Sequence, residues 1–246
     1  AIISIVRYSG LARFTSFGQQ YRFDEILLSK HVGKKYQELV PVHDYNKIHE
    51  EWWQKTLDGV PDVTWPGKIK YYALSSGTSE AASKYIPVTR ELLRSNTINY
   101  MRQLLSLFSY EQANKWALTK GFLMLGGATD LKKGKAGWYA GDLSGILAKK
   151  RPFWFQTFYK PGGRTAAIAD WNQKLNDIVE RAKDWDIGFI VGVPAWCQMC
   201  MEMVIEHYKV KHIHEIWPNF SFFVHGGVAF EPYKKAFEKL LGKPIV

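Results

Sequence analysis

The sequence predicts an α/β fold with a mixed, largely parallel sheet flanked by helices. Short buried-type strands alternate with amphipathic helices along the 246 residues, which is the pattern that βαβ units produce. Several of these strands end in glycine pairs, as at Gly126-Gly127 and Gly226-Gly227. A hydrophobic content of 46% and an aromatic content of 15% supply enough apolar surface for one large domain or two small ones.

The N-terminal segment is predicted to contain helices and loops. Residues 40–45 favour an extended entry into a helix that carries Ile48, Trp52 and Trp53. A loop follows this helix and is marked by Pro61, Pro66 and Gly67, since proline and glycine punctuate regular structure.

Two strands, 69–74 and 85–88, are predicted on either side of a loop of hydroxyl side chains. From Ser75 to Ser79, four of five residues carry an O–H group and the fifth is glycine. Hydroxyls and free backbone N–H groups donate hydrogen bonds, and glycine lets the backbone approach closely, so this loop suits anionic oxygens. Lys84 adds positive charge. The alternative is an ordinary polar turn, because Ser, Thr and Gly are common loop residues.

Helix starts are marked by capping residues. A helix is predicted from an N-cap at Thr89 to about Phe108, because its apolar residues recur with a period of about 3.6. Another helix is predicted after Asp170, which forms a capping-box signature with Gln173. The remaining strands are predicted at 121–125, 189–193 and 220–224, and the remaining helices begin at Pro194 and Pro232.

Four loops follow predicted strands and are candidates for one shared edge. They are Ser75–Ser79, Gly126-Gly127, Gly192-Val193-Pro194 and His225-Gly226-Gly227. In open parallel sheets, ligands bind outside the carboxyl ends of the strands. This edge is therefore the predicted location of a binding site.

The chain is basic, with a formal net charge of +10. This charge favours anionic partners, such as nucleotide phosphates, nucleic acid or acidic membranes, without choosing among them. The basic runs at 132–135 and 149–151 are read as solvated faces. No apolar run is long enough to span a bilayer, so we expect no membrane partner. Two cysteines make no disulfide framework, which predicts the reducing cytoplasm.

Two motifs offer competing functions. Residues 196–200 (Trp-Cys-Gln-Met-Cys) have the spacing of a redox motif that opens a helix, but the apolar residues around them favour buried cysteines. His207, His212 and His214 lack the clustered partners that a zinc site needs, so we predict no metal site there. At His43 and His225 we expect a hydrogen-bonding role in a loop.

An ordered series of motifs covers nearly the whole chain. It comprises Phe17-Gly18 with Tyr21, Val40–Tyr45, Ser75–Ser79 with Ser83–Thr89, Gly141–Ile146, Gly192–Trp196, Trp217–Asn219 and His225–Tyr233. In this order, the series resembles the Gretchen Hagen 3 (auxin-responsive) acyl acid–amido synthetases, in a bacterial form.

The resemblance implies an adenylate-forming enzyme, similar in its large domain to firefly luciferase and the acyl-CoA ligases. In that chemistry a carboxylate attacks the α-phosphorus of Mg·ATP, pyrophosphate leaves, and an amine then forms the amide. Hydroxyl and N–H donors with a divalent metal stabilise the charge of the transferring group. By resemblance, the phosphates are bound by Ser75, Ser76, Gly77, Thr78 and Ser79, with Lys84 at the motif's basic position. The segment beside the adenine and acyl groups is Gly226, Gly227 and Val228.

The chain departs from the family pattern at two places. Glu80-Ala81-Ala82 replaces a stretch that is often richer in glycine and positive charge. The sequence stops at Val246, before the family's second motif, its ribose-binding aspartate and its mobile C-terminal domain. The resemblance therefore implies that residues 1–246 are an incomplete N-terminal adenylation domain, inactive or nearly so without the C-terminal half.

The alternative is a non-catalytic basic module that binds nucleic acid or another anionic partner. Such binding would weaken steeply with salt, because bound phosphates release counterions. Positive charge is also expected around an ATP site, so we prefer the ligase and do not expect nucleic acid as a partner. The predicted cofactors are ATP and Mg2+, and the predicted partners are a small carboxylic acid and an amine or amino acid.

Overall fold

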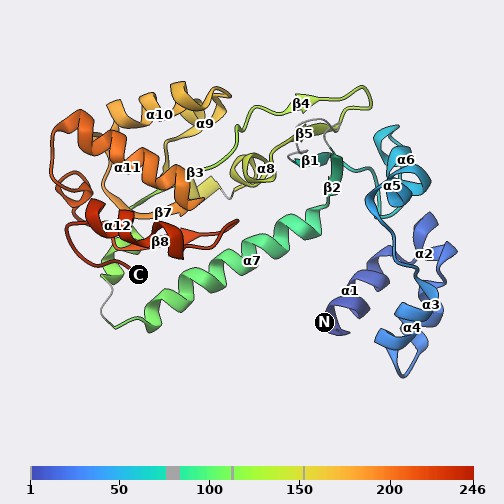
Figure 1. Ribbon diagram of the computed structural model, residues 1–246. Helices are drawn as coiled ribbons and strands as arrows, with labels where there is room; N and C mark the ends of the chain where they lie inside the picture. The colour runs from blue at the N-terminus through green and yellow to red at the C-terminus, as the bar shows by residue number, and fades with distance from the viewer. Residues whose placement is uncertain (1, 76–83, 112–113, 152) are drawn as a thin grey trace. The chain divides into compact units, whose positions relative to one another are not determined.

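A computed structural model describes residues 2–75, 84–111, 114–151 and 153–246 (Figure 1). The chain divides into two compact units. Unit 1 comprises Ala1–Leu92 and Lys132–Ala140, and unit 2 comprises Leu93–Leu131 and Gly141–Val246. The first boundary falls inside helix α7, Arg90–Ser106. Each unit has its own sheet and its own hydrophobic core.

Unit 1 begins with helices, as predicted. They are α1 (Ile2–Ala12), α2 (Ser16–Gln20), α3 (Phe23–Leu28), α4 (Val32–Leu39), α5 (Tyr45–Ile48), a π-helical turn (His49–Trp53) and α6 (Gln54–Leu57). The extended entry is confirmed from Val40 to Asp44, whereas Tyr45 already begins α5. Asp44 caps this helix by accepting a hydrogen bond of 2.8 Å from the Lys47 backbone N–H. Ala12, Phe23 and Ile26 form a small buried core.

The sheet of unit 1 has the strand order β2-β1-β5-β4. Its strands are β1 (Tyr71–Ser75), β2 (Lys84–Val88), β4 (Lys132–Lys133) and β5 (Tyr139–Gly141). Strand β1 pairs antiparallel with β2, and β4 pairs antiparallel with β5. Tyr72 is fully buried, and its hydroxyl donates a 2.8 Å hydrogen bond to Thr56 Oγ1, which ties α6 to the sheet.

Unit 2 contains a wholly parallel sheet with the order β6-β3-β7-β8. Its strands are β3 (Gly121–Leu125), β6 (Tyr159–Lys160), β7 (Ile187–Gly192) and β8 (Phe222–His225). The predicted strands at 121–125, 189–193 and 220–224 are confirmed with shifts of a few residues at their ends. The predicted α/β fold class with a largely parallel sheet is confirmed by this unit.

Helices cover both faces of the parallel sheet (Figure 1). On one face, α10 (Trp171–Glu180) and α11 (Pro194–Tyr208) pack on Leu123 and Ile190. On the other face, the alternating residues Phe122 and Phe189 pack toward α7 and α8 (Leu143–Lys149), as the two-residue period of a strand requires. The remaining elements are α9 (Gly163–Ala167), α12 (Lys234–Leu240) and the 3-10 turns Leu107–Ser109, Lys115–Thr119, Phe153–Phe155, Ala182–Asp184, Ile213–Glu215 and Glu231–Tyr233.

The predicted N-caps at Thr89 and Asp170 are confirmed, with the capping box at Asp170 shown only in the bond that its carboxylate accepts. The Asp170 carboxylate accepts a 2.7 Å hydrogen bond from the Gln173 backbone N–H, and Thr89 Oγ1 accepts one of 3.1 Å from Leu92. Both bonds satisfy N–H groups that have no partner within the first helical turn. Among the helices that the structure describes, none has the length and apolarity needed to cross a bilayer.

The loop that starts at Ser75 does not follow a strand of the parallel sheet, because β1 belongs to the sheet of unit 1. Strands β1 and β2 are separated by only the residues 76–83 and pair antiparallel in the sheet of unit 1. Parallel pairing needs a crossover connection of about a dozen residues or more, which the short segment between these strands does not provide. The other three loops belong to unit 2.

Candidate functional site

Three glycine-containing loops lie together at the carboxyl edge of the parallel sheet. Gly126-Gly127 follows β3, and Gly192-Val193-Pro194 joins β7 to α11. His225-Gly226-Gly227 follows β8, and Leu125 and Gly192 as well as Gly192 and His225 are cross-strand partners. The structure therefore brings together three of the four loops that the sequence singled out.

A polar group, which we call the edge cluster, surrounds the end of β3. It consists of Gly126, Gly127, Ser144 and Lys174. The Gly127 N–H donates a 2.9 Å hydrogen bond to Ser144 Oγ at the start of α8, and Lys174 Nζ donates one of 3.2 Å to the Gly126 carbonyl oxygen. A small cavity of about 10 Å³ adjoins all four residues, enough for about one water molecule. The cluster fixes the loop after β3 against α8 and α10.

Lys174 is a buried cation. Its exposed fraction is 3%, and burial lowers the pKa of its ammonium group, while the Asp142 carboxylate acts to raise it. Sequence reasoning missed this residue, although a signal was present. Lys174 lies on the same helical stripe as Trp171, Leu175 and Ile178, where an apolar residue is expected.

Replacing Lys174 with methionine is expected to remove a pH dependence of stability. The folded-state pKa lies below the ordinary 10.5, so between these two values the unfolded chain binds more protons than the folded chain. The free energy of unfolding of the natural chain should therefore rise with pH relative to the variant, by at most about 1.4 kcal/mol per pH unit. Urea unfolding near neutral pH and at about pH 10 measures the difference. The exposed Lys183, replaced in the same way, is the control; parallel pH profiles for all three proteins would contradict the expectation.

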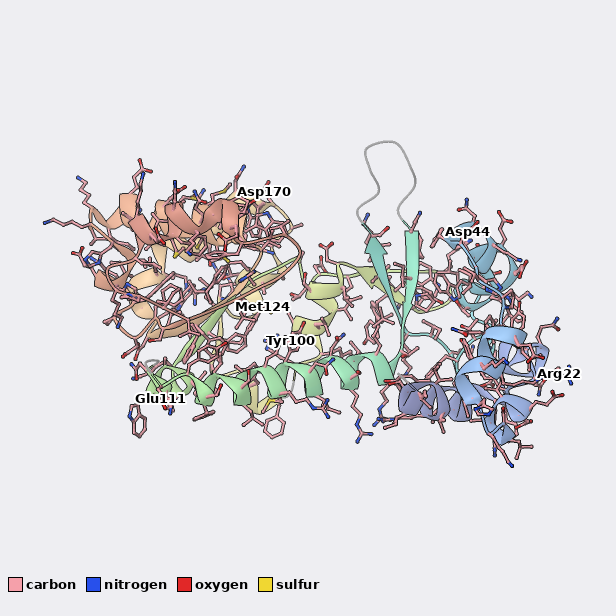
Figure 2. All side chains as sticks on the ribbon, turned by 60° about the horizontal axis from the view of Figure 1, so that its bottom comes forward. Arg22, Asp44, Tyr100, Glu111, Met124 and Asp170 are labelled. Atoms are coloured by element: carbon pink, nitrogen blue, oxygen red, sulfur yellow. The ribbon has the colours of Figure 1, made fainter. Side chains whose placement is uncertain are left out.

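A larger hollow, which we call the apolar cavity, lies on the other face of the sheet. It has a volume of about 150 Å³ and is lined by α7, α8 and all four strands of the sheet. Figure 2 labels Tyr100 on α7 and Met124 on β3, which line it from its two sides. Val191 and Val224, near the carboxyl ends of β7 and β8, also line it, so the cavity reaches toward the edge that carries the loops.

The interpretation of the basic run 149–151 as a solvated face is wrong for Arg151. The side chain lines the apolar cavity, and its Nε atom is buried. Its guanidinium carbon lies 3.9 Å from the centre of the Tyr159 ring. Charge runs are most often solvated, and nothing in the local sequence shows that the chain turns this residue inward.

The predicted adenine and acyl segment follows β8 in unit 2. Gly227 has a φ angle of 87°, a left-handed conformation that favours glycine. Gly226 and Val228 are exposed, with 47% of Val228 accessible. A flat, accessible backbone at the carboxyl edge is compatible with a planar ligand, but its role stays a prediction.

The predicted phosphate loop is described only at its two ends. Ser75 closes β1 and is the cross-strand partner of Lys84, the first residue of β2. Lys84 is exposed, and its Nζ lies 4.9 Å from the centre of the Tyr45 ring, an arrangement that suits a cation–π contact. Ser76, Gly77, Thr78 and Ser79 lie outside the described residues, so their role as phosphate ligands also stays a prediction.

The two competing motifs serve the core. Cys197 and Cys200 are buried, and burial raises the pKa of Cys200 to about 12 and that of Cys197 well above its ordinary value. Reactive cysteines need a lowered pKa, so the interpretation as buried core cysteines is confirmed. His214 Nδ1 accepts a hydrogen bond from the Gly242 N–H, which leaves Nε2 to donate to the Phe220 carbonyl oxygen at 2.9 Å.

The described residues contain no group of three or more His, Cys, Asp or Glu side chains suited to a metal ion. The expected loop role of His43 is confirmed, because its Nε2 lies 3.2 Å from the Tyr21 hydroxyl. His225 instead ends strand β8, and its ring stacks with those of Phe223 and Phe230.

A scan against models of protein families matched the GH3 family N-terminal domain over residues 10–177. A search of curated proteins gave no match. Among solved structures, "GH3.15 acyl acid amido synthetase" is similar with a TM-score of 0.67 and 13% identity, covering 97% of this chain and 50% of that chain. "AtGH3.15 acyl acid amido synthetase in complex with 2,4-DB" is similar with a TM-score of 0.58 and 20% identity, covering 85% and 36%. The chain thus spans 50% of the length of the first structure and 36% of the length of the second.

Proposed function

Since the chain belongs to the GH3 family, whose N-terminal domain matches residues 10–177, we propose that it activates a carboxylic acid with ATP for amide formation. The matched range includes the hydroxyl loop and Lys84, and this observation carries the proposal. The solved structures with this fold are named acyl acid amido synthetases. We further propose that the chain acts as the N-terminal part of such an enzyme.

The proposed reaction has two steps. An oxygen of the carboxylate forms a bond to the α-phosphorus of ATP, and the bond from that phosphorus to pyrophosphate breaks. The nitrogen of an amine, such as that of an amino acid, then bonds to the acyl carbon, AMP leaves and the amine loses a proton. Both steps develop negative charge on phosphate or carbonyl oxygens, which fixed hydrogen-bond donors and cations stabilise.

The residues of the chain divide these tasks in our proposal. Ser75–Ser79 and Lys84 donate hydrogen bonds and charge to the phosphates, and Gly226-Gly227-Val228 lies beside the adenine. The apolar cavity of unit 2 holds the body of the acid, because most of its lining is apolar and it reaches Val191 and Val224 near the carboxyl ends of β7 and β8. The described donors fit a triphosphate in their chemistry, since Lys84 is an exposed cation beside hydroxyls. When bound, Mg2+ would neutralise phosphate charge.

Exchange of labelled pyrophosphate into ATP tests the first step. We expect exchange that depends on an added carboxylic acid, measured over a panel of aliphatic and aromatic acids. Because the similar structure is about twice as long, the assay should use both the 246-residue chain and the longest product of its gene. No acid-dependent exchange with either protein would refute the proposal.

A further inference from the structure

Lys150 and Arg151 both line the apolar cavity, and the Arg151 guanidinium has no matching anion among the described residues. Arg151 lines this cavity, and its Nη1 donates a hydrogen bond to the Ala148 carbonyl oxygen. Its buried Nε has no hydrogen-bond acceptor among the described residues. No salt bridge joins its guanidinium to a carboxylate in the described part of the chain. A buried charged donor without an acceptor is unfavourable, so a bound anion would stabilise this arrangement.

The register of the parallel sheet places Arg151 far from the edge where the loops lie. Its guanidinium lies over the ring of Tyr159, and Tyr159, Phe122 and Phe189 are cross-strand partners in one row. The row of Gly192 and His225 lies three residues further along the strands. At about 3.3 Å per residue, the two rows are about 10 Å apart. One end of the cavity therefore lies near the carboxyl edge that carries the glycine loops, and the other end lies near Arg151.

The strand side chains between these two ends are apolar. Met124, Val191 and Val224 are cross-strand partners in a row between the two ends. The rings of Phe122 and Phe189 stack with their centres 5.2 Å apart. These strand residues favour a hydrocarbon or aromatic body. Helix α7 adds the uncharged polar side chains Thr97, Tyr100 and Gln103 to the lining.

We propose that the apolar cavity binds a dicarboxylic acid, whose second carboxylate binds Arg151 about 10 Å from the carboxylate that reacts. Nε and Nη2 form one edge of the guanidinium, and this edge matches the two oxygens of a carboxylate. The hydrogen bond from Nη1 to Ala148 and the stacking on Tyr159 hold the group in position. The identity of the reacting end rests on the proposed function, whereas the binding of the second carboxylate does not.

Calorimetric titration of the 246-residue chain with two matched acids tests this inference. Extended nonanedioic acid spans a length comparable to the cavity, and nonanoic acid has the same chain with one carboxylate. We expect the diacid to bind at least about tenfold more tightly, as a charge-assisted pair in an apolar site provides. Equal affinities, tighter binding of nonanoic acid, or no measurable binding of either acid would overturn the inference.

Substitution of Arg151 identifies the group responsible. Arg151→Met keeps an apolar stem in the cavity and should abolish the preference for the diacid without weakening nonanoic acid. Arg102→Met removes the same charge from an exposed position on α7 and should leave the preference unchanged. A preference that survives in Arg151→Met would overturn the inference.

Two further measurements keep the test decisive. If circular dichroism shows that Arg151→Met does not fold, the natural chain is titrated with diacids of different lengths instead. The affinity should be highest near nonanedioic acid and lower for heptanedioic and undecanedioic acids. An affinity without such a maximum would refute the inference. Pyrophosphate exchange then separates the two proposals. Exchange with nonanoic acid and none with diacids would refute the inference alone. Binding of the diacid through Arg151 without exchange for any acid would refute the proposed function alone.

Discussion

Replacing Gly188 with alanine is expected to lower the free energy of unfolding of unit 2 by about 3 kcal/mol or more. Gly188 lies in β7, where a Cβ atom would stand 1.8 Å from the carbonyl oxygen of Ala117 and 2.6 Å from its carbonyl carbon. Both neighbours are backbone atoms. The Gly188 carbonyl oxygen also accepts a 2.9 Å hydrogen bond from Ser221, so β7 cannot shift without breaking contacts on its other side.

Urea unfolding monitored by circular dichroism measures this effect. The control is Gly163→Ala, because a Cβ atom at Gly163 has no neighbour within 4 Å and this glycine opens helix α9. That change is expected to be neutral or to stabilise the chain by up to about 1 kcal/mol. An unfolding midpoint for Gly188→Ala equal to that of the control would show that the contact between β7 and residue 117 is looser than described.

The parallel sheet was predictable from the sequence because its strands carry their own signal. Residues 187–192 form an uninterrupted apolar run, and such runs are typical of strands buried on both faces. The helix caps at Thr89 and Asp170 were predictable for a similar reason, since each depends on a local hydrogen bond. Local chemistry thus determined most of unit 2.

The division into two sheets was not predictable in the same way. Strands β4 and β6 have only two residues each, too few to show a period. Their pairing is decided by contacts between distant parts of the chain. The short connection between β1 and β2 predicts their antiparallel pairing. The alternation of strands and helices elsewhere in the chain nevertheless favoured a single sheet.

The candidate site shows the same contrast. The loops after β3, β7 and β8 were predictable because glycine marks them, and the hydroxyl loop stood out by composition and by resemblance. Arg151 and Lys174 were missed because burial, rather than residue type, gives them their character. Their positions inside the fold depend on how α8 and α10 pack, and side-chain direction in a basic run cannot be read from one sequence.

Replacing Thr78 with valine is expected to reduce acid-dependent pyrophosphate exchange by about a hundredfold or more. In our proposal the Thr78 hydroxyl donates to the phosphate oxygens, where negative charge increases as pyrophosphate leaves. Valine has nearly the shape of threonine but no donor, so the change removes one hydrogen bond without removing volume. Because the lost bond is stronger in the transition state than in bound ATP, the loss should appear mainly in kcat.

The matched control is Thr119→Val, an exposed threonine at the end of a 3-10 turn whose hydroxyl donates a hydrogen bond to the backbone oxygen of Trp116. Exchange should be unchanged in this variant. A titration with a fluorescent ATP analogue gives a second readout on the 246-residue chain, where Thr78→Val should bind more weakly than Thr119→Val. If both variants retain exchange and nucleotide affinity, the loop at 75–79 is an ordinary polar turn, and the phosphates must be bound elsewhere in the protein.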